Sequence, residues 1–393
     1  MSSPSAPDAV TRETEREARS QSLSQGAIGT VLLRIERAHQ GTDSWATVHG
    51  QLAAIVRSDL IASDEAALFY GAPAVAFTLH AAVADTGRYA GALHTLDSAI
   101  HALTRRRLDK AHARIDRGER PRAGEYDVLY GLAGLGSYLL RRDPHSDVLR
   151  EVLAYLVRLS EPLPNDDEQL PGWWSPHGPT ADSMHSFPGG HGNAGMAHGI
   201  AGPLALLALT KLRGSTVDGH TEAMGRICTW FDTLRQDTDF GPWWPRWITR
   251  TEHHTRTITQ PGPTRPSWCY GTPGMARAQQ LTGLALHDIN RQHMAETALL
   301  RCLSDPHQLA LVNDTTLCHG TAGLLHTTSC VARDAEPGTF TTHLRHLRSL
   351  LLHQEPARDE GLLEGTTGAE LALHAADTGG TPVSGWDACL LLN

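Results

Sequence analysis

The sequence predicts an all-α fold, an α/α toroid, from three observations. A Gly-x-x-Gly motif, or Gly-x-x-Ala in one case, followed by a mostly apolar run recurs seven times in the 393 residues. The spacing of these motifs suits two helices with their connections in each repeat. Hydrophobic residues make up 40% of the chain, which is enough for a sizeable core. The motifs begin at Gly26, Gly71, Gly131, Gly199, Gly271, Gly320 and Gly365.

The runs after the glycines, such as "HGIAGPLALL", are apolar on nearly every side, which is typical of helices packed on all faces. Between the motifs lie amphipathic stretches such as "DVLREVLAYLVRLSE", with acidic residues near their starts. We therefore expect seven helical hairpins with inner and outer helix layers. No hairpin buries its own apolar face, so neighbours must stack, and a closed ring removes exposed terminal repeats.

The glycines have two expected roles at the start of each inner helix. They allow a sharp turn with positive φ, and they let backbones approach closely at a crowded end. The second motif reads Gly-x-x-Ala and departs from the pattern.

The domain organisation follows from composition along the chain. Residues 1–20, rich in charge and serine, predict a mobile tail, and residues 21–393 predict a single toroid domain. The widest intervals flank Gly199 and contain tryptophan-rich loops. We expect an insertion around residues 214–266, where "WITRTEHHTRTIT" nearly alternates and favours a small α/β element. A long loop closing the outer barrel is the alternative.

Composition excludes several classes of function. A net charge of −9 and a pI of about 6.2 do not favour a nucleic-acid partner, which requires clustered basic surface. The sequence has no apolar run long enough for a transmembrane segment, and its start lacks the apolar core of a secretion signal. We therefore expect a cytoplasmic protein, in which the six cysteines are free thiols or metal ligands rather than disulfides.

Four of the seven turns carry chemically active side chains. In a toroid equivalent turns converge on one end of the barrel, so Asp127, His198, Cys269, Cys318 and His319 are expected to share one pocket. Cys269, Cys318 and His319 form a thiolate, thiolate and imidazole set that suits zinc with one coordination position open. The alternative is two buried thiols and a core histidine.

These motifs also resemble a known family. The segments "SWCYGTPG", "LCHGTAG", "AHGIAG" and "YDVLYGLAG", set in seven Gly-x-x-Gly hairpins, are similar to those of the lanthionine synthetase C family, the cyclases of lanthipeptide biosynthesis. The resemblance extends from about Gly26 to the end of the chain. It implies an α/α toroid with one Zn²⁺ per chain, held by Cys269, Cys318 and His319.

The resemblance also implies roles for the other residues at the turns. His198 and Asp127 match the family's proposed acid/base groups, and Arg265 and Tyr270 match positions near the metal. Imidazole titrates near neutrality, so His198 is the natural proton donor to an enolate. Asp127 either orients His198 or binds the peptide backbone, with a helix N-cap as the structural alternative. Arg265 is expected to stabilise the enolate, unless it is an ordinary loop arginine.

The implied substrate is a precursor peptide with a leader, in which serines and threonines have already been dehydrated. The implied reaction adds a cysteine thiol to dehydroalanine or dehydrobutyrine and forms a (methyl)lanthionine thioether ring. Zinc lowers the pKa of the incoming thiol. We expect a separate dehydratase as one partner and an exporter as another. A biosynthetic complex with these partners would place the protein at the membrane periphery.

Two further groups of residues receive expectations. We expect exposed tryptophans of the loops to contact an extended peptide, Trp243 and Trp244 above all, and Tyr270 to form a wall of the metal site. Cysteines outside the turn motifs are expected to be buried small hydrophobes. The loop tryptophans are Trp173, Trp174, Trp243, Trp244 and Trp247, and these cysteines are Cys228, Cys302, Cys330 and Cys389.

Three other functions remain open from the sequence. A relative that binds glutathione at zinc and adds it to alkenes, or that only regulates, would carry the same motifs. A zinc-dependent thiol prenyltransferase also uses an α/α toroid, but with an Asp-Cys-His ligand set. An α/α-barrel glycosidase needs two opposed acids, and only Asp127 lies at a motif turn.

Overall fold

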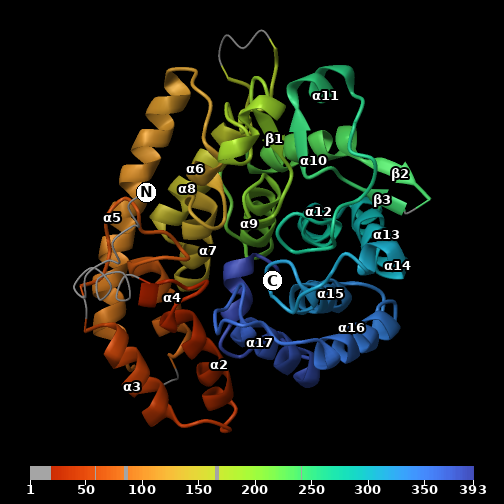
Figure 1. Cartoon of the computed structure of the whole chain (residues 1–393). Helices are drawn as coiled ribbons and strands as arrows, with labels where there is room; N and C mark the ends of the chain where they lie inside the picture. The colour runs from red at the N-terminus through yellow and green to blue at the C-terminus, as the bar shows by residue number, and fades with distance from the viewer. Residues whose placement is uncertain (1–18, 58, 84–86, 164–167, 240) are drawn as a thin grey trace, which may run out of the picture.

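The protein is an α/α toroid, as the sequence predicts (Figure 1). The computed structural model describes all residues except 1–18, 58, 84–86, 164–167 and 240, so nearly all of the predicted tail at 1–20 lies outside the described residues. Within the described part, seven inner helices begin at or just after the seven glycine motifs. They are α2 (Ala27–His39), α4 (Ala72–Ala81), α7 (Leu132–Arg142), α9 (Ala201–Leu212), α12 (Thr272–Leu286), α15 (Thr321–Asp334) and α17 (Thr366–Thr378).

The inner helices form a closed ring. Each contacts the next in chain order, and α17 contacts α2. In the described residues six inner helices are followed by an outer helix that packs against them, and α17 is followed instead by the 3₁₀ helix η2 (Trp386–Leu390). The outer helices are α3 (Trp45–Ile55), α5 (Ala90–Asp116), α8 (Asp147–Leu159), α10 (His220–Leu234), α13 (Ile289–Ser304) and α16 (Thr341–His353).

Sequence pattern explains the two layers. Residues 201–210 of α9 are all buried, because inner helices are packed between two neighbours and an outer helix. Helix α8 buries one face only, and its N-terminus is capped by Ser146, whose side chain accepts a hydrogen bond from the Leu149 N–H. Among the described helices, none combines the length and the apolar character needed to cross a bilayer.

At these turns the glycines allow backbones to approach closely, and most of them do not adopt positive φ. This corrects the expectation of positive φ at the start of each inner helix. Of the first glycines of the motifs, only Gly71 has positive φ, at 73°. At the second glycines the chain is crowded instead. A Cβ on Gly274 would lie 2.0 Å from the carbonyl oxygen of Trp268, in the turn that precedes the helix. Glycine is therefore required there because a backbone occupies the space of a side chain.

The C-terminal segment fills the centre of the ring, where Figure 1 places the C-terminus. Helix η2 and the residues after it are buried. Their carbonyl oxygens accept hydrogen bonds from three inner-layer side chains, so the segment is fastened to several repeats at once. The donors are Ser137 Oγ to Ala388 at 2.7 Å, Trp268 Nε1 to Leu390 at 3.0 Å and Arg277 Nε to Leu392 at 2.8 Å.

The segment 214–266, for which an insertion was predicted, contains the outer helix α10 and then short irregular elements. Strands β2 (Gln236–Thr238) and β3 (Gly241–Trp243) pair antiparallel, and β4 (Trp247–Thr249) pairs antiparallel with β1 (His191–Asn193). The prediction of a strand through "WITRTEHHTRTIT" holds only for its first three residues. Helix α11 (Arg250–Thr255) follows because Thr249 and Glu252 form a capping box. The other short helices are η1 (Ala181–Ser186), α6 (Ala123–Tyr126) and α14 (Pro306–Leu309).

Candidate metal centre and active site

A ring of hydrogen bonds joins the turns that precede the inner helices. Six of the seven neighbouring pairs are linked backbone to backbone, and the pair formed by the second and third turns is bridged by Arg107 of α5, whose guanidinium donates to the carbonyls of Ala66 and Tyr130. Residues far apart in the sequence therefore meet at one mouth. The backbone links run from the N–H to the carbonyl at 2.9–3.3 Å and are Leu23 to Phe69, Val128 to Ala197, Met196 to Cys269, Cys269 to Cys318, Cys318 to Leu363 and Leu363 to Ser24.

Cys269, Cys318 and His319 come together at this mouth. One ligand atom from each lies within 4.8 Å of the other two, and Cys269 is buried while the other two are partly exposed. A hydrogen bond with the Cys318 thiol, assisted by His319, holds the pKa of Cys269 well below its usual value despite burial. The same contact raises the pKa of Cys318. Two sulfurs and an imidazole facing a partly open side are a donor set that fits zinc.

Asp314 supports the histidine of this set and was missed in the sequence analysis. Its Oδ2 lies 3.7 Å from His319 Nε2 and 3.4 Å from Arg265 Nη1. Its Oδ1 accepts hydrogen bonds from the backbone N–H and the hydroxyl of Thr316 at 2.9 and 2.6 Å, which fixes the carboxylate. The signal available in the sequence was the Asp-x-Thr turn directly before the Cys-His-Gly motif. Arg265 thus lies at the mouth, paired with an acid.

His198 and Asp127 form a close pair on the other side of the mouth. His198 Nδ1 lies 2.6 Å from Asp127 Oδ2, and the Asp127 side chain is only 1% exposed. Asp127 Oδ1 accepts from the backbone N–H groups of Tyr130 and Gly131 at 2.7 and 2.8 Å. The carboxylate therefore fixes the turn before α7 with one oxygen and contacts the histidine with the other. Of the predicted alternatives, the pairing with His198 is present, whereas no described side chain caps the N-terminus of α7.

Two tyrosine rings enclose His198. The Tyr130 ring stacks on it with centroids 5.7 Å apart, and the Tyr270 ring with centroids 6.1 Å apart. Burial raises the pKa of Tyr270 to about 12, so its hydroxyl stays protonated near neutral pH. Tyr130 is 58% exposed and was not among the predicted site residues, although it lies within the quoted segment "YDVLYGLAG".

Two cavities open on either side of this histidine. One, of about 530 Å³, is lined by Asp127, Tyr130, His198 and Tyr270 together with the loop after Ser175. The other, of about 350 Å³, is lined by Tyr130, His198, Cys318 and residues of the first, second and last turns. His198 and Tyr130 border both cavities, and Cys318 of the thiol cluster borders the second.

The prediction of exposed tryptophans is wrong for four of the five. Trp173, Trp174, Trp243 and Trp244 are at most 3% exposed, so Trp243 and Trp244 do not present peptide-binding surface. Indole rings bury a large apolar area, and here Trp173 packs against Trp230 and Trp244 against Phe231, both of α10. Trp244 Nε1, for example, donates to the Phe231 carbonyl at 3.1 Å. Trp247 alone is partly exposed, and its ring lies against Tyr270 at 5.7 Å.

The four cysteines outside the turns are buried, as predicted. Burial raises the pKa of Cys228 to about 12 and that of Cys302 and Cys389 further. Cys330 differs, because it contacts His326 and Arg333 rather than apolar neighbours alone.

The fold and the site together define a class: α/α toroids in which two thiols and an imidazole, a candidate metal centre, lie beside a histidine and aspartate pair. The chain belongs to the lanthionine synthetase C-like protein family, whose model matches residues 17–391. A relative, the nisin biosynthesis protein NisC of Lactococcus lactis subsp. lactis, is 23% identical over 319 residues, which are 78% of this chain and 72% of the relative. The solved structure of nisin cyclase has the same fold, with a TM-score of 0.80 at 22% identity over 98% of this chain and 95% of that chain.

Proposed function

We propose that the protein is a zinc-dependent lanthipeptide cyclase. It would add cysteine thiols of a dehydrated precursor peptide to dehydroalanine or dehydrobutyrine and so form thioether rings. The observation that carries this proposal is the meeting of two groups at one mouth. Cys269, Cys318 and His319 lie within 4.8 Å of one another, and His198, paired with Asp127, borders the same space as Cys318.

Zinc would be held by Cys269, Cys318 and His319. Two thiolates and a neutral imidazole balance the charge of the dication, so the site favours a soft, anionic fourth ligand. When bound, zinc supplies a lowered pKa for the substrate thiol while the two protein thiolates keep its sulfur electron-rich. Asp314 faces His319 and Arg265 and would hold both side chains in place.

His198 would move the proton. Because its Nδ1 is directed at Asp127, Nε2 is the ring nitrogen left for the substrate. Addition breaks the S–H bond, forms an S–C bond at the β-carbon and leaves an enolate that needs a proton at the α-carbon. One imidazole can accept the first proton and return it in the second step, so the reaction balances without another reagent.

The remaining residues of the mouth would bind or position the substrate. Arg265 can donate hydrogen bonds to the carbonyl whose oxygen becomes negative during addition. Tyr270 and Tyr130 limit the rotation of the His198 ring, and exposed Tyr130 offers an aromatic face to the peptide. The groups at this mouth serve addition to an existing alkene. The protein would therefore act after a partner enzyme that dehydrates the precursor. We place this protein and its partner enzyme in the cytoplasm.

The test uses a synthetic peptide with one dehydroalanine and one cysteine. Thiol loss is followed by alkylation and mass spectrometry, in D₂O so that protonation labels the α-carbon. We expect the parent protein with bound zinc to consume the thiol and incorporate one deuterium. Cys269→Ser should lose the zinc at the mouth together with activity, and His198→Asn should keep that zinc and lose activity. A folded, zinc-bound parent that leaves the peptide thiol untouched but adds glutathione to the alkene would replace this proposal with the glutathione alternative.

A further inference from the structure

A second cluster of metal-ligand side chains lies inside the ring, away from the mouth. His326 and Cys330 stand one turn apart on α15, and Asp387 comes from η2 in the C-terminal segment. Their ligand atoms lie within 4.8 Å of one another. His326 is 1% exposed, and Cys330 and Asp387 are both 0% exposed. Residues four apart on a helix share a face, which is a common spacing for two metal ligands.

The distances suit one small ion. His326 Nε2 lies 3.7 Å from Cys330 Sγ and 2.9 Å from Asp387 Oδ2. Tetrahedral zinc with ordinary bond lengths separates its sulfur, nitrogen and oxygen ligands by about 3.3–3.6 Å. The two pairs that include His326 are therefore within about half an ångström of these separations. Cys330 Sγ and the Asp387 carboxylate oxygen lie within 4.8 Å of each other.

Two features of the cluster are unusual for a plain hydrogen-bonded core. Asp387 Oδ1 and His326 Nδ1 are buried and have no hydrogen-bond partner among the described residues. Buried polar atoms are normally paired, so each side chain keeps one unused polar atom, while Nε2 and Oδ2 are hydrogen-bonded to each other. Asp387 Oδ2 also accepts from Asn393 Nδ2 at 2.6 Å, and the Trp386 ring lies 4.7 Å from the His326 ring, so both ligands are fixed in place.

Charge is compatible with a dication. A thiolate at Cys330, a carboxylate at Asp387 and a neutral His326 would cancel the charge of a divalent ion. Arg333 Nη2 lies 3.2 Å from Cys330 Sγ and favours the thiolate. The Arg333 residue is exposed, so its own charge is solvated and screened.

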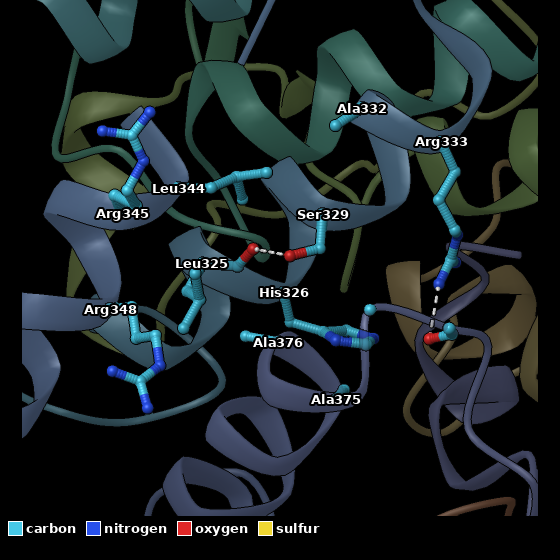
Figure 2. Close-up of a pocket in the computed structure, with 12 residues that line it drawn as sticks. Leu325, His326, Ser329, Ala332, Arg333, Leu344, Arg345, Arg348, Ala375 and Ala376 are labelled. Atoms are coloured by element: carbon cyan, nitrogen blue, oxygen red, sulfur yellow. Dashed lines mark hydrogen bonds between the residues drawn. The ribbon is translucent and has the colours of Figure 1, made fainter. Parts of the chain in front are cut away.

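An entry path leads to the cluster. A cavity of about 290 Å³ between α15, α16 and α17 is lined by His326, Ser329 and Arg333 among others. Figure 2 shows the His326 side chain extending from α15 past Ala375 and Ala376 of α17, with Arg333 beside it. An ion and its water can therefore reach the imidazole from solvent.

We propose that His326, Cys330 and Asp387 form a second zinc site, with water from this cavity as the fourth ligand. Its role is structural. The ion joins α15 to the C-terminal segment, which in turn is hydrogen-bonded to α7 and α12 and to Trp268, the residue before Cys269. The proposal does not depend on catalysis at the mouth.

Elemental analysis of the full-length protein and its variants tests this proposal. We expect about two zinc ions in the parent and one each in Cys330→Ser and Cys269→Ser. The double variant should bind none. Cys389→Ser is the matched control, because Cys389 is also a buried thiol of the C-terminal segment but bonds only the Trp386 carbonyl, at 3.3 Å. It should keep both ions. Folding of each variant is checked by circular dichroism.

The outcomes separate the two sites. A parent with one zinc that Cys269→Ser loses and Cys330→Ser keeps would overturn the second site. A parent with one zinc that is lost only in Cys330→Ser would support the second site and contradict the metal at the mouth. If Cys330→Ser does not fold, Asp387→Asn takes its place. A cobalt-loaded double variant, Cys269→Ser with Cys318→Ser, has no thiol left at the mouth and should then show a thiolate charge-transfer band, and the absence of the band would also refute the proposal.

Discussion

Substitution of Asp127 by asparagine removes charge from the acid/base pair while retaining its size. In the parent, Asp127 Oδ1 accepts two backbone N–H groups and Oδ2 faces His198 Nδ1 at 2.6 Å. In Asp127→Asn the amide oxygen can keep the two backbone bonds. The amide nitrogen then points at His198 and donates, so Nδ1 must accept. The doubly protonated imidazole that donates the final proton is no longer supported.

The size of the effect follows from this one contact. A hydrogen bond to a charged group contributes about 1.5–3 kcal/mol, and about 1.4 kcal/mol corresponds to a factor of ten in rate. We therefore expect cyclisation to slow by about 10- to 150-fold. The zinc content should not change, because Asp127 contacts none of the three ligands.

Single-turnover cyclisation across pH, with deuterium incorporation at the α-carbon, measures this effect. Asp97→Asn is the matched control, because Asp97 also accepts charge-assisted and hydroxyl hydrogen bonds, from Arg142 and Tyr138, but lies in the outer layer. It should leave the rate profile unchanged. A parent-like rate in folded Asp127→Asn would refute the proposed pairing of Asp127 with the proton donor.

Three other substitutions test separate parts of the structure. Trp244→Ala should destabilise the fold by about 3–5 kcal/mol in urea unfolding, since it empties a buried site, while zinc content and peptide affinity stay as in the parent. Burial lowers the pKa of His80 to about 4 from its ordinary 6.5. As the pH falls from 6.5 to 4, the unfolded chain therefore binds a proton at His80 that the folded chain does not yet bind. The free energy of unfolding decreases over this pH range. His80→Gln should reduce the loss between pH 7 and 4.5 by about 1–2 kcal/mol, and an unchanged loss would contradict the assignment. Asp314→Asn should weaken zinc binding at His319 by about 10- to 100-fold in competition with a chelator, and parent-like affinity would contradict its supporting role.

The parts of the fold that the sequence predicted are those encoded locally. Each inner helix starts at a glycine motif because a backbone crowds that position, and such crowding admits no side chain at Gly274. The repeat then predicts which turns meet. The sign of φ could not be read in the same way, because glycine serves positive φ and close approach equally well. Among the first glycines of the seven motifs, only Gly71 has positive φ.

Burial of the loop tryptophans could not be predicted from the sequence. Trp173 and Trp244 stand beside glycine and proline, a context typical of exposed loops, yet Trp230 and Phe231 of α10 cover them. These partners lie on another element, and no periodic pattern links the two. Asp314 was missed for a similar reason, because its contact with Arg265 exists only once two turns of the ring are neighbours.

The ring of hydrogen bonds explains why a site drawn from distant repeats can be well defined. The N–H of Cys269 donates to the Cys318 carbonyl and the N–H of Met196 to the Cys269 carbonyl, so main-chain bonds set the spacing of the proposed metal ligands and of the segment that carries His198. Side chains at the mouth can then differ without moving the turns. Substrate choice can therefore change through residues such as Tyr130, which face the cavities, while the thiol cluster keeps its position. The same closure also makes the site depend on every repeat, since opening any one turn removes the neighbour against which the next is fixed.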